Sequence, residues 1–428
     1  MSSETHRAID AVWRIESPRL IAGLVRLVRD LGLAEDLAQD ALVAALEQWP
    51  RDGIPRNPGA WLMATAKHRA IDQLRRKQRL ARKTEELGRE LEVHGKNIAE
   101  DASEMIEEEE IGDDLLRLIF MCCHPVLSTE SRVALTLRIL GGLTTDEIAR
   151  AFLVPEPTIA QRIVRAKRTL GEAHVPFEVP GDDELKARLS SVLEVVYLIF
   201  NEGYAATSGD DWIRPALVDD ALRLGRVLAG LEPKEAEVLG LLALMEIQAS
   251  RIRARTGPSG EPILLFDQDR SRWDQLLIRR GLAGLARAEA LAGPLGPYAL
   301  QAAIAACHAR ARVPEETDWP RIVALYDALA QLTPSPVVEL NRGVAAGMAF
   351  GPAAGLEIVD ALLDEPSLKS YHLLPAVRAD LLTKLGRFNE ARAEFERAAS
   401  LTRNVRERDL LLQRAAATSS DASSAATA

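Results

Sequence analysis

The sequence predicts an all-α protein built from several domains. Its 428 residues are enough for two or three domains, and a hydrophobic share of 47% allows each of them a sizeable core. Apolar residues recur at helical spacing along nearly every periodic stretch, and no convincing run alternates with the period of a strand. We therefore expect two small helical domains followed by a longer helical domain.

The N-terminal segment and the cysteines predict a cytoplasmic protein. The opening MSSETHRAID has no basic segment followed by an apolar one, so no signal peptide is predicted. No apolar run approaches the roughly 20 residues of a membrane-spanning helix. Three cysteines, Cys122, Cys123 and Cys307, are too few for a disulfide framework and fit a reducing compartment.

Charge is strongly segregated along the chain. The formal net charge is −10, yet residues 51–83 hold ten Lys or Arg against two acids. Residues 84–114 hold thirteen acids against two bases. Because salt screens such fields within about 10 Å, each block acts locally. The acidic block is therefore a candidate shield for the basic one.

The composition also suggests where the domains begin and end. VPFEVPG at 175–181 is a short Pro/Gly linker. The predicted division, in chain order, is a helical unit at 1–83, an acidic linker at 84–112, a second helical unit at 113–174, a long helical domain at 182–413 and a disordered tail at 414–428.

A repeat is visible near the C-terminus. Aligning Gly343 with Ala379 also aligns Gly355 with Ala391, a shift of 36 residues. This is close to the period of about 34 residues of tetratricopeptide (TPR) helical hairpins. The long domain is therefore predicted to be TPR-like.

Residues 144–170 have the pattern of a helix-turn-helix. In TTDEIARAF, Thr144 and Glu147 form a capping box, and Pro157 suits the first position of a second helix. That helix should bury Ile159, Ile163, Ala166 and Leu170. Its opposite face and flank carry the polar and basic residues Thr158, Gln161, Arg162, Arg165, Lys167 and Arg168. Such a helix can read the major groove, whereas the alternative is a solvated basic surface.

The helix predicted over residues 34–49 has an acidic surface. It should bury Leu37, Ala41, Ala45 and Trp49. Asp36 and Asp40 stand at i and i+4, a like-charge pairing that costs a few tenths of a kcal/mol. The pairing suggests a basic partner, and an ordinary solvated acidic face is the alternative.

The loop PRDGIPRNP leads into a basic helix, GAWLMATAKHRAIDQLRRKQR. Its expected buried stripe is Leu62, Ala66, Ala70 and Leu74. Trp61 lies off that stripe among Lys and Arg residues, where an exposed ring could stack on unpaired bases. The alternative role for Trp61 is plain core packing.

These motifs, in this order, resemble regions 2 and 4 of bacterial RNA polymerase sigma factors. The acidic helix ending in Trp49, the NPGAW…AIDQLRR helix and the LTTDEIARAF helix-turn-helix carry the resemblance, which covers residues 1–172. The short form without region 3 is similar to the extracytoplasmic-function (ECF) group. The remainder resembles the subgroup with a long TPR-like extension, in which NEGYAATSGDDWIR, FDQDRSRWD and GPYALQAAIAACHA recur.

The resemblance implies partners and site residues. For docking on the clamp helices of the largest subunit of core polymerase it implies Asp36, Leu37, Gln39 and Asp40. For the −10 element it implies Arg56 and Asn57 in the base-capturing loop, and Trp61, Lys67, Arg69, Arg75 and Arg76 on the helix that holds the opened strand. For the −35 element it implies Thr158, Gln161, Arg162, Arg165, Lys167 and Arg168. No cofactor, metal or membrane partner is implied, and the TPR-like part has a protein as its candidate partner.

Three other clusters contain residue types found in chemical sites. MCCHP offers two cysteines and a histidine, but without the C-x₂₋₄-C spacing of zinc sites, so helix packing is expected. FDQDRSRWD could hold a metal or catalytic carboxylates, but a salt-bridged network is favoured. Glu202 and Tyr204 of NEGY are expected to make an interhelical polar contact.

The predicted function is that of a sigma factor without an active site. It would recognise −35 and −10 elements, melt DNA with core polymerase and be regulated by its own C-terminal domain. One alternative is a helix-turn-helix regulator whose TPR-like domain senses a signal and which never joins polymerase. Another is an enzyme in the C-terminal half.

Overall fold

The computed structural model confirms the all-α prediction. It describes residues 2–86, 108–152, 154–206, 208–209, 211–291 and 293–425. This part of the chain also holds two parallel strands of two residues each, β1 (Ser208–Gly209) and β2 (Arg403–Asn404). The chain divides into two compact units, Met1–Val196 and Tyr197–Ala428.

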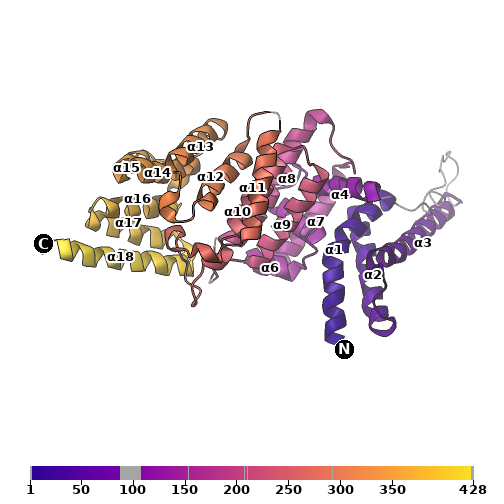
Figure 1. Ribbon diagram of the computed structural model, residues 1–428. Coiled ribbons are helices and arrows are strands. Elements are labelled where there is room, and N and C mark those ends of the chain that lie inside the picture. The colour runs from indigo at the N-terminus through magenta and orange to yellow at the C-terminus, as the bar shows by residue number, and fades with distance from the viewer. Residues whose placement is uncertain are drawn as a thin grey trace. The chain divides into compact units, whose positions relative to one another are not determined.

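The first unit is a compact set of helices. Its elements are α1 (Ser2–Val28), α2 (Leu31–Asp52), α3 (Pro58–Glu86), α4 (Glu108–Cys122), α5 (Thr129–Ile139), α6 (Thr145–Phe152), α7 (Glu156–Glu172) and the first part of α8 (Asp182–Tyr204) (Figure 1). Helix α1 contacts α2, α3 and α4, while α5 and α6 pack against α7. Asp30 caps α2 by accepting a hydrogen bond of 2.8 Å from the amide of Leu33.

The first unit extends further along the chain than the predicted linker at 175–181. The first half of α8 packs against α4 and α5 in the same unit. The Ser191 hydroxyl donates to the Cys123 carbonyl at 2.8 Å, Arg188 donates to the Phe120 carbonyl at 3.0 Å, and Arg132 pairs with Glu194 at 3.2 Å. Leu189, Val192 and Val195 of the same part of α8 are buried. The unit boundary therefore lies inside α8, after the Pro/Gly linker.

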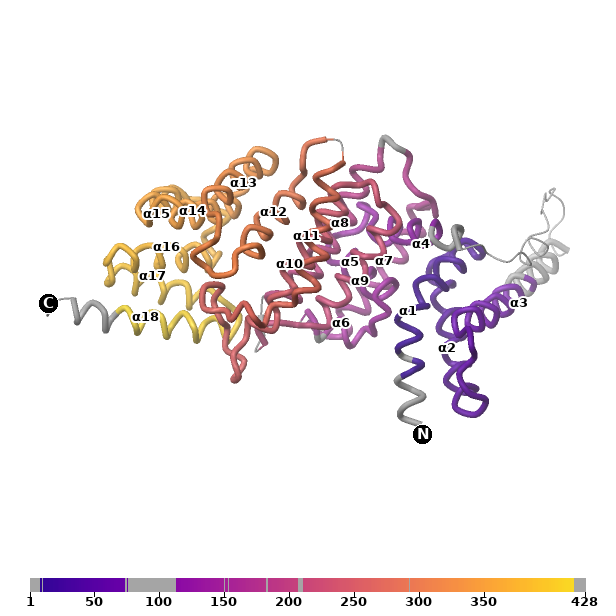
Figure 2. The backbone as a smooth tube through the Cα atoms, viewed as in Figure 1, coloured from indigo at the N-terminus to yellow at the C-terminus, as the bar shows by residue number. Residues whose placement is uncertain are grey.

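The second unit is a succession of helices in which each contacts the next. Its elements are the end of α8, α9 (Pro215–Leu231), α10 (Ala236–Ala249), η2 (Ile252–Ala254), η3 (Leu265–Asp267), η4 (Arg270–Arg272), α11 (Gln275–Ala290), α12 (Pro297–Arg310), η5 (Pro314–Glu316), α13 (Trp319–Leu332), α14 (Pro336–Phe350), α15 (Pro352–Asp360), η6 (Pro366–Leu368), α16 (Leu373–Lys384), α17 (Phe388–Leu401) and α18 (Val405–Ala425), with β1 and β2 (Figure 2).

The aligned repeat falls on two helix pairs, α14–α15 and α16–α17. In the first pair a Cβ added to Gly355 would lie 2.6 Å from the Gly343 carbonyl oxygen, so the helices meet backbone to backbone. In the second pair the equivalent residues, Ala379 and Ala391, are both fully buried. Small residues at matched positions thus set the close approach within each pair.

The prediction of a disordered tail from residue 414 is wrong up to residue 425. Helix α18 continues to Ala425, and both Ala415 and Thr418 are buried. Ala415 belongs to a cluster with Phe395 and Ala398 of α17, which gives the low-complexity segment an apolar surface to pack on. Across the described residues, each helix is too short or too polar to cross a lipid bilayer.

Candidate nucleic-acid interface

Helices α6 and α7 form the predicted helix-turn-helix. The capping box is present: the Glu147 amide donates to the Thr144 hydroxyl at 3.1 Å, and the Thr144 amide donates to the Glu147 carboxylate at 2.8 Å. Helix α7 begins at Glu156, so Pro157 occupies its second position, not the first. Its buried residues are the predicted set, Ile159, Ile163, Ala166 and Leu170. The opposite face of α7 is thereby turned outward.

The six polar residues of α7 that are predicted to contact DNA differ in solvent exposure and in their ion pairs. Gln161, Arg165 and Arg168 are exposed, while Thr158, Arg162 and Lys167 are half-buried. Arg168 pairs with Glu172 of its own helix at 2.6 Å, across exposed side chains that exchange readily with water. Lys167 forms an ion pair with Glu35 of α2. Gln161 and Arg165 are therefore the side chains best presented by this helix.

Glu35 is a buried carboxylate that the sequence did not single out. It is 4% exposed and also accepts hydrogen bonds from Arg138 of α5 at 2.7 Å and from Gln39 at 2.8 Å. Burial alone raises the pKa of Glu35, but Lys167 and Arg138 outweigh it and hold the pKa below its ordinary value. The carboxylate is thus charged near neutral pH and ties α2 to α5 and α7.

Two further ion pairs join the same parts of the first unit. Arg14 of α1 reaches Glu147 of the capping box at 2.9 Å, and Arg26 of α1 reaches the buried Asp114 of α4 at 3.2 Å. Gly142, at φ 70°, sits against Arg14 and Ser17 of α1, where a side chain would be both strained and crowded. The turn before α6 is therefore packed directly on α1.

Helices α2 and α3 carry the predicted acidic and basic surfaces. As predicted, Leu37, Ala41, Ala45 and Trp49 are buried on α2, and Leu62, Ala66 and Ala70 on α3. Trp61 is half-buried and meets Trp49 edge to face, with ring centroids 5.4 Å apart. Trp61 thus takes part in packing against the core, and its remaining exposure leaves the base-stacking role a prediction.

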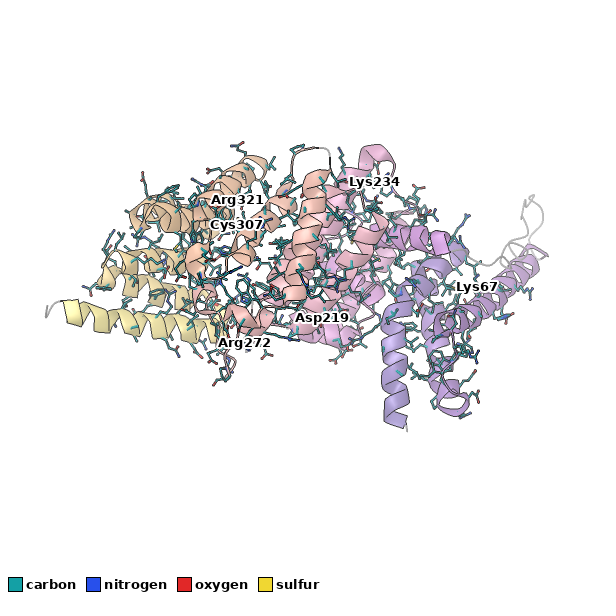
Figure 3. All side chains as sticks on the ribbon, in the orientation of Figure 1. Lys67, Asp219, Lys234, Arg272, Cys307 and Arg321 are labelled. Atoms are coloured by element: carbon teal, nitrogen blue, oxygen red, sulfur yellow. The ribbon has the colours of Figure 1, made fainter. Side chains whose placement is uncertain are left out.

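The segment before α3 is shorter than the predicted loop. Helix α2 includes Pro50 and runs to Asp52, so the connection is Gly53 to Asn57. Arg56 is exposed, but the Asn57 side chain accepts a hydrogen bond of 3.1 Å from the Ala60 amide and thus caps α3. Lys67 lies on α3 (Figure 3) and Arg75 is exposed further along it. The side chains of Leu74 and Arg76 lie outside the described residues. Of the acidic linker predicted at 84–112, residues 84–86 instead belong to α3 and 108–112 to α4, while 87–107 lie outside the described residues.

The four residues predicted to dock on polymerase divide into two kinds. Asp36 and Asp40 are exposed, whereas Leu37 is 1% exposed and belongs to the core. Gln39 is held by Glu35. Asp40 forms an ion pair with Arg69 of α3 at 3.3 Å. The basic partner predicted for the Asp36 and Asp40 pair is therefore, for Asp40, a residue of the same unit. Leu37 therefore supports the helix and does not present a contact surface.

Comparison with known proteins agrees with this arrangement. Residues 13–80 match the model for sigma-70 region 2, and residues 117–170 match that for sigma-70 region 4. The ECF RNA polymerase sigma factor SigK of Mycobacterium tuberculosis (strain ATCC 25618 / H37Rv) is 30% identical over 35% of this chain and 77% of its own length.

This chain belongs to the ECF RNA polymerase sigma factors.

Other relatives extend the comparison. The probable RNA polymerase sigma-C factor of Mycobacterium bovis is 27% identical over 40% of this sigma factor and 80% of its own length. An uncharacterized protein of Rhizobium meliloti (strain 1021) is 44% identical over 93% of both chains. Residues 188–289 match a family of unknown function (DUF6596). Both sigma regions thus lie in the first unit, and the sigma factor has its role in transcription initiation.

MCCHP is used for packing, as expected. Cys122 and Cys123 are buried, and the thiol of Cys123 lies 3.5 Å from the Thr136 hydroxyl. Burial raises the pKa of Cys123 to about 11, so this thiol stays protonated. Within the described residues, no group of three His, Cys, Asp or Glu side chains could hold a metal ion.

The acidic residues of the two remaining motifs, NEGY and FDQDRSRWD, also make contacts within the protein. Glu202 pairs with Arg214, and the Tyr204 hydroxyl accepts a hydrogen bond of 2.7 Å from Arg251. The acids of FDQDRSRWD do not form the expected salt-bridged network: Asp269 caps η4 and Asp274 caps α11 through amide hydrogen bonds. Short polar side chains before a helix favour caps, which explains the difference.

Proposed function

We propose that this sigma factor recognises −35 and −10 promoter elements and promotes melting once it has joined core polymerase. The exposed face of α7, with Gln161 and Arg165, would read the −35 duplex. Helix α3 and the Gly53–Asn57 connection, with Trp61 and Arg56, would hold the opened −10 strand. The observation that carries this proposal is the pairing of a capped helix-turn-helix with a second cationic helix, α3, that carries a half-exposed tryptophan.

The physical reason for two separate cationic helices is the energy of opening DNA. Extruding a base from the stack costs a few kcal/mol. Stacking on an aromatic ring recovers roughly 1–3 kcal/mol per base, and contacts between arginine and phosphate add a salt-dependent share. Docking of the Asp36 and Asp40 surface on the polymerase clamp helices would fix both DNA-binding helices along one promoter.

A transcription assay with purified core polymerase and a promoter library tests the proposal. The full chain should form holoenzyme and produce run-off transcripts. Arg165→Ala should weaken promoter binding by about 10- to 100-fold, since a bidentate base contact is worth about 1–3 kcal/mol. Arg280→Ala is the matched control, because Arg280 is an exposed arginine on α11 in the second unit. Holoenzyme that starts no transcripts from any template would refute the proposal.

The alternative is a helix-turn-helix regulator that acts without polymerase. The exposed carboxylates of α2 favour the polymerase-bound form, since a plain regulator has no use for a docking helix. Capture of core polymerase by the full chain, and its loss in Asp36→Lys, separates the two functions.

The second unit is proposed to regulate the first and to have no catalytic activity. It would act in the cytoplasm by binding a protein through its TPR-like helix pairs α14–α15 and α16–α17. A truncation tests this only if α8 is retained, because Arg188, Ser191 and Glu194 bond to α4 and α5. A chain ending at Tyr204 should therefore change in promoter activity without losing the fold of the first unit.

A further inference from the structure

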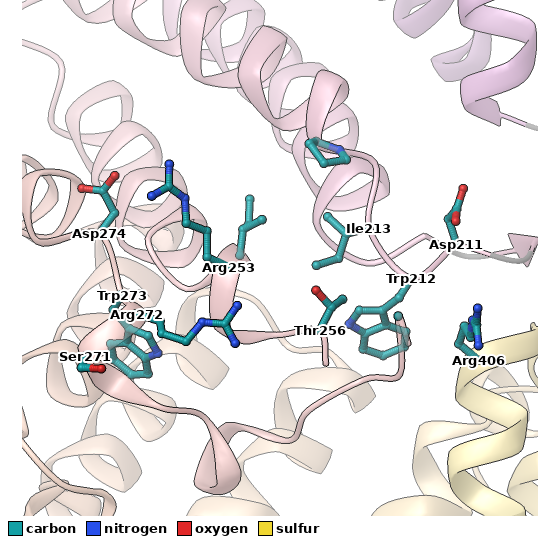
Figure 4. Close-up of a pocket in the computed structure, with 13 residues that line it drawn as sticks. Asp211, Trp212, Ile213, Arg253, Thr256, Ser271, Arg272, Trp273, Asp274 and Arg406 are labelled. Atoms are coloured by element: carbon teal, nitrogen blue, oxygen red, sulfur yellow. The ribbon is translucent and has the colours of Figure 1, made fainter. Parts of the chain in front are cut away.

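Two sequence motifs without an assigned role line one pocket of the second unit. Asp211 to Ile213 come from NEGYAATSGDDWIR, and Ser271 to Asp274 come from FDQDRSRWD. Residues of η2 and of the start of α18 complete the lining (Figure 4). The pocket has a volume of about 870 Å³, within the range of roughly 300–1,000 Å³ that is typical of small-ligand sites.

The polar lining of this pocket is dominated by arginines. Arg253, Arg272 and Arg406 come from three separate segments, and all three are exposed. In the part of the chain that the structure describes, none of these guanidinium groups forms an ion pair within 4.0 Å of a carboxylate. Figure 4 shows the Arg272 side chain reaching from its own segment toward Thr256 and Trp212. Cationic side chains that line one pocket and form no close ion pair are suited to an anion.

Two tryptophans also line the pocket. The indole N–H groups of Trp212 and Trp273 have no hydrogen-bond partner among the described residues. Both nitrogens are buried, and Trp273 as a whole is 4% exposed, so the rings contribute apolar surface and no accessible donor. The lining also holds two acids, Asp211 and Asp274, and the Asp274 carboxylate caps α11 by accepting from the amides of Leu276 and Leu277 at 2.9 and 3.1 Å. With both acids counted, the three arginines leave the lining with one net positive charge.

The walls of the pocket are held in place before any ligand arrives. Asn404, 1% exposed, donates hydrogen bonds to the carbonyls of Ala206 and Asp211 at 3.2 and 2.9 Å. The Arg255 guanidinium is buried 3.6 Å from the Tyr204 ring centroid and 5.4 Å from that of Trp212. A site that is already ordered loses little conformational entropy on binding.

We propose that this pocket binds a small organic anion through its carboxylate or phosphate groups. Arg253, Arg272 and Arg406 would supply charge-assisted hydrogen bonds to the ligand oxygens, and Trp212 would pack against its body. The proposal concerns a ligand of the second unit and is independent of promoter recognition by the first.

Calorimetric titration of the full chain with citrate and, separately, with pyrophosphate tests the proposal at constant ionic strength. At least one of the two probes should bind. Binding of citrate identifies a carboxylate site, and binding of pyrophosphate a phosphate site. The variants are Arg272→Ala, Arg406→Ala and their combination, with Arg280→Ala as the control.

Each pocket variant should weaken binding by about tenfold or more, the size of a charge-assisted hydrogen bond, and the combination should abolish it. Because the side chains of Arg272 and Arg406 are exposed and form no hydrogen bond with a described residue, the melting temperatures of the variants should stay close to that of the parent. The proposal is overturned by lack of binding of both probes, or by binding that the combined variant retains. Binding that Arg280→Ala reduces equally would also overturn it.

Discussion

Glu35 of α2 accepts a hydrogen bond of 2.7 Å from Arg138 of α5, although 103 residues separate the two along the sequence. The same carboxylate pairs with Lys167 of α7. One buried acid thus joins the sigma region 2 helices to the helix-turn-helix of region 4. It also holds one of the lysines that the sequence places on the DNA-binding face.

Removing this carboxylate should destabilise the first unit. Glu35→Ala leaves Arg138 and Lys167 without their shared partner, but both keep about a fifth of their surface exposed and can be solvated in part. We expect a loss of about 2 kcal/mol in the free energy of unfolding, below the full cost of a broken buried pair. Urea denaturation measures it, with Asp36→Asn on the exposed side of α2 as control; equal stability of both variants would contradict the prediction.

The pH dependence of stability should report the same group. The pKa of Glu35 in the folded protein lies below its ordinary value of 4.5. The stabilisation is therefore complete above that value and is lost as pH falls through the lowered folded pKa. Unfolding free energies of the parent and of Glu35→Gln, measured from about pH 6 to about pH 3, should converge in acid. A constant difference across that range would argue against the assignment.

Release of Lys167 should strengthen binding to duplex DNA. In Glu35→Gln the ammonium group is no longer tied to a carboxylate and can reach a phosphate. One added phosphate contact steepens the dependence of log K on log salt by about 0.9. Fluorescence anisotropy with a labelled duplex measures this slope. The double variant Glu35→Gln, Lys167→Ala is the control and should show the smaller slope of the Lys167→Ala variant alone.

Trp61 should matter for promoter opening more than for folding. Its ring packs edge to face on Trp49 and keeps part of its surface exposed. In holoenzyme, Trp61→Ala should reduce the open-complex equilibrium by about 10-fold or more, through loss of base stacking worth roughly 1–3 kcal/mol. Trp61→Phe should keep the open-complex equilibrium close to that of the parent. Permanganate reactivity of thymines near −10 measures promoter opening. Full reactivity in Trp61→Ala would rule out a stacking role.

The close contact between α14 and α15 should not tolerate a methyl group. A Cβ at Gly355 would lie 2.6 Å from the Gly343 carbonyl oxygen and 2.7 Å from the Gly347 Cα. Gly355→Ala should cost about 1–3 kcal/mol of stability through overpacking. Gly230→Ala, at a position of α9 with open space around it, should instead stabilise by about 0.5–1 kcal/mol. Thermal unfolding of both variants checks the opposite signs.

The helices and their buried faces could be predicted because their signals are local. The apolar spacing in α7 identifies Ile159, Ile163, Ala166 and Leu170, and the capping box at Thr144 marks the start of α6. Such patterns depend on residues within a few turns of each other, so they survive any arrangement of the rest. The family motifs in residues 13–80 and 117–170 depend on the same short-range sequence patterns.

Contacts between distant segments were decided by the tertiary structure alone. The burial of Glu35, the ion pair of Lys167 and the attachment of α8 to α4 depend on side chains that no periodicity connects. The extension of α18 through a low-complexity tail depends on the apolar surface of α17. Likewise, Arg253, Arg272 and Arg406 form one pocket because packing brings three segments together. The pairing of charges far apart in sequence is set by the free energy of burying them together, which is a property of the folded chain and not of any short segment.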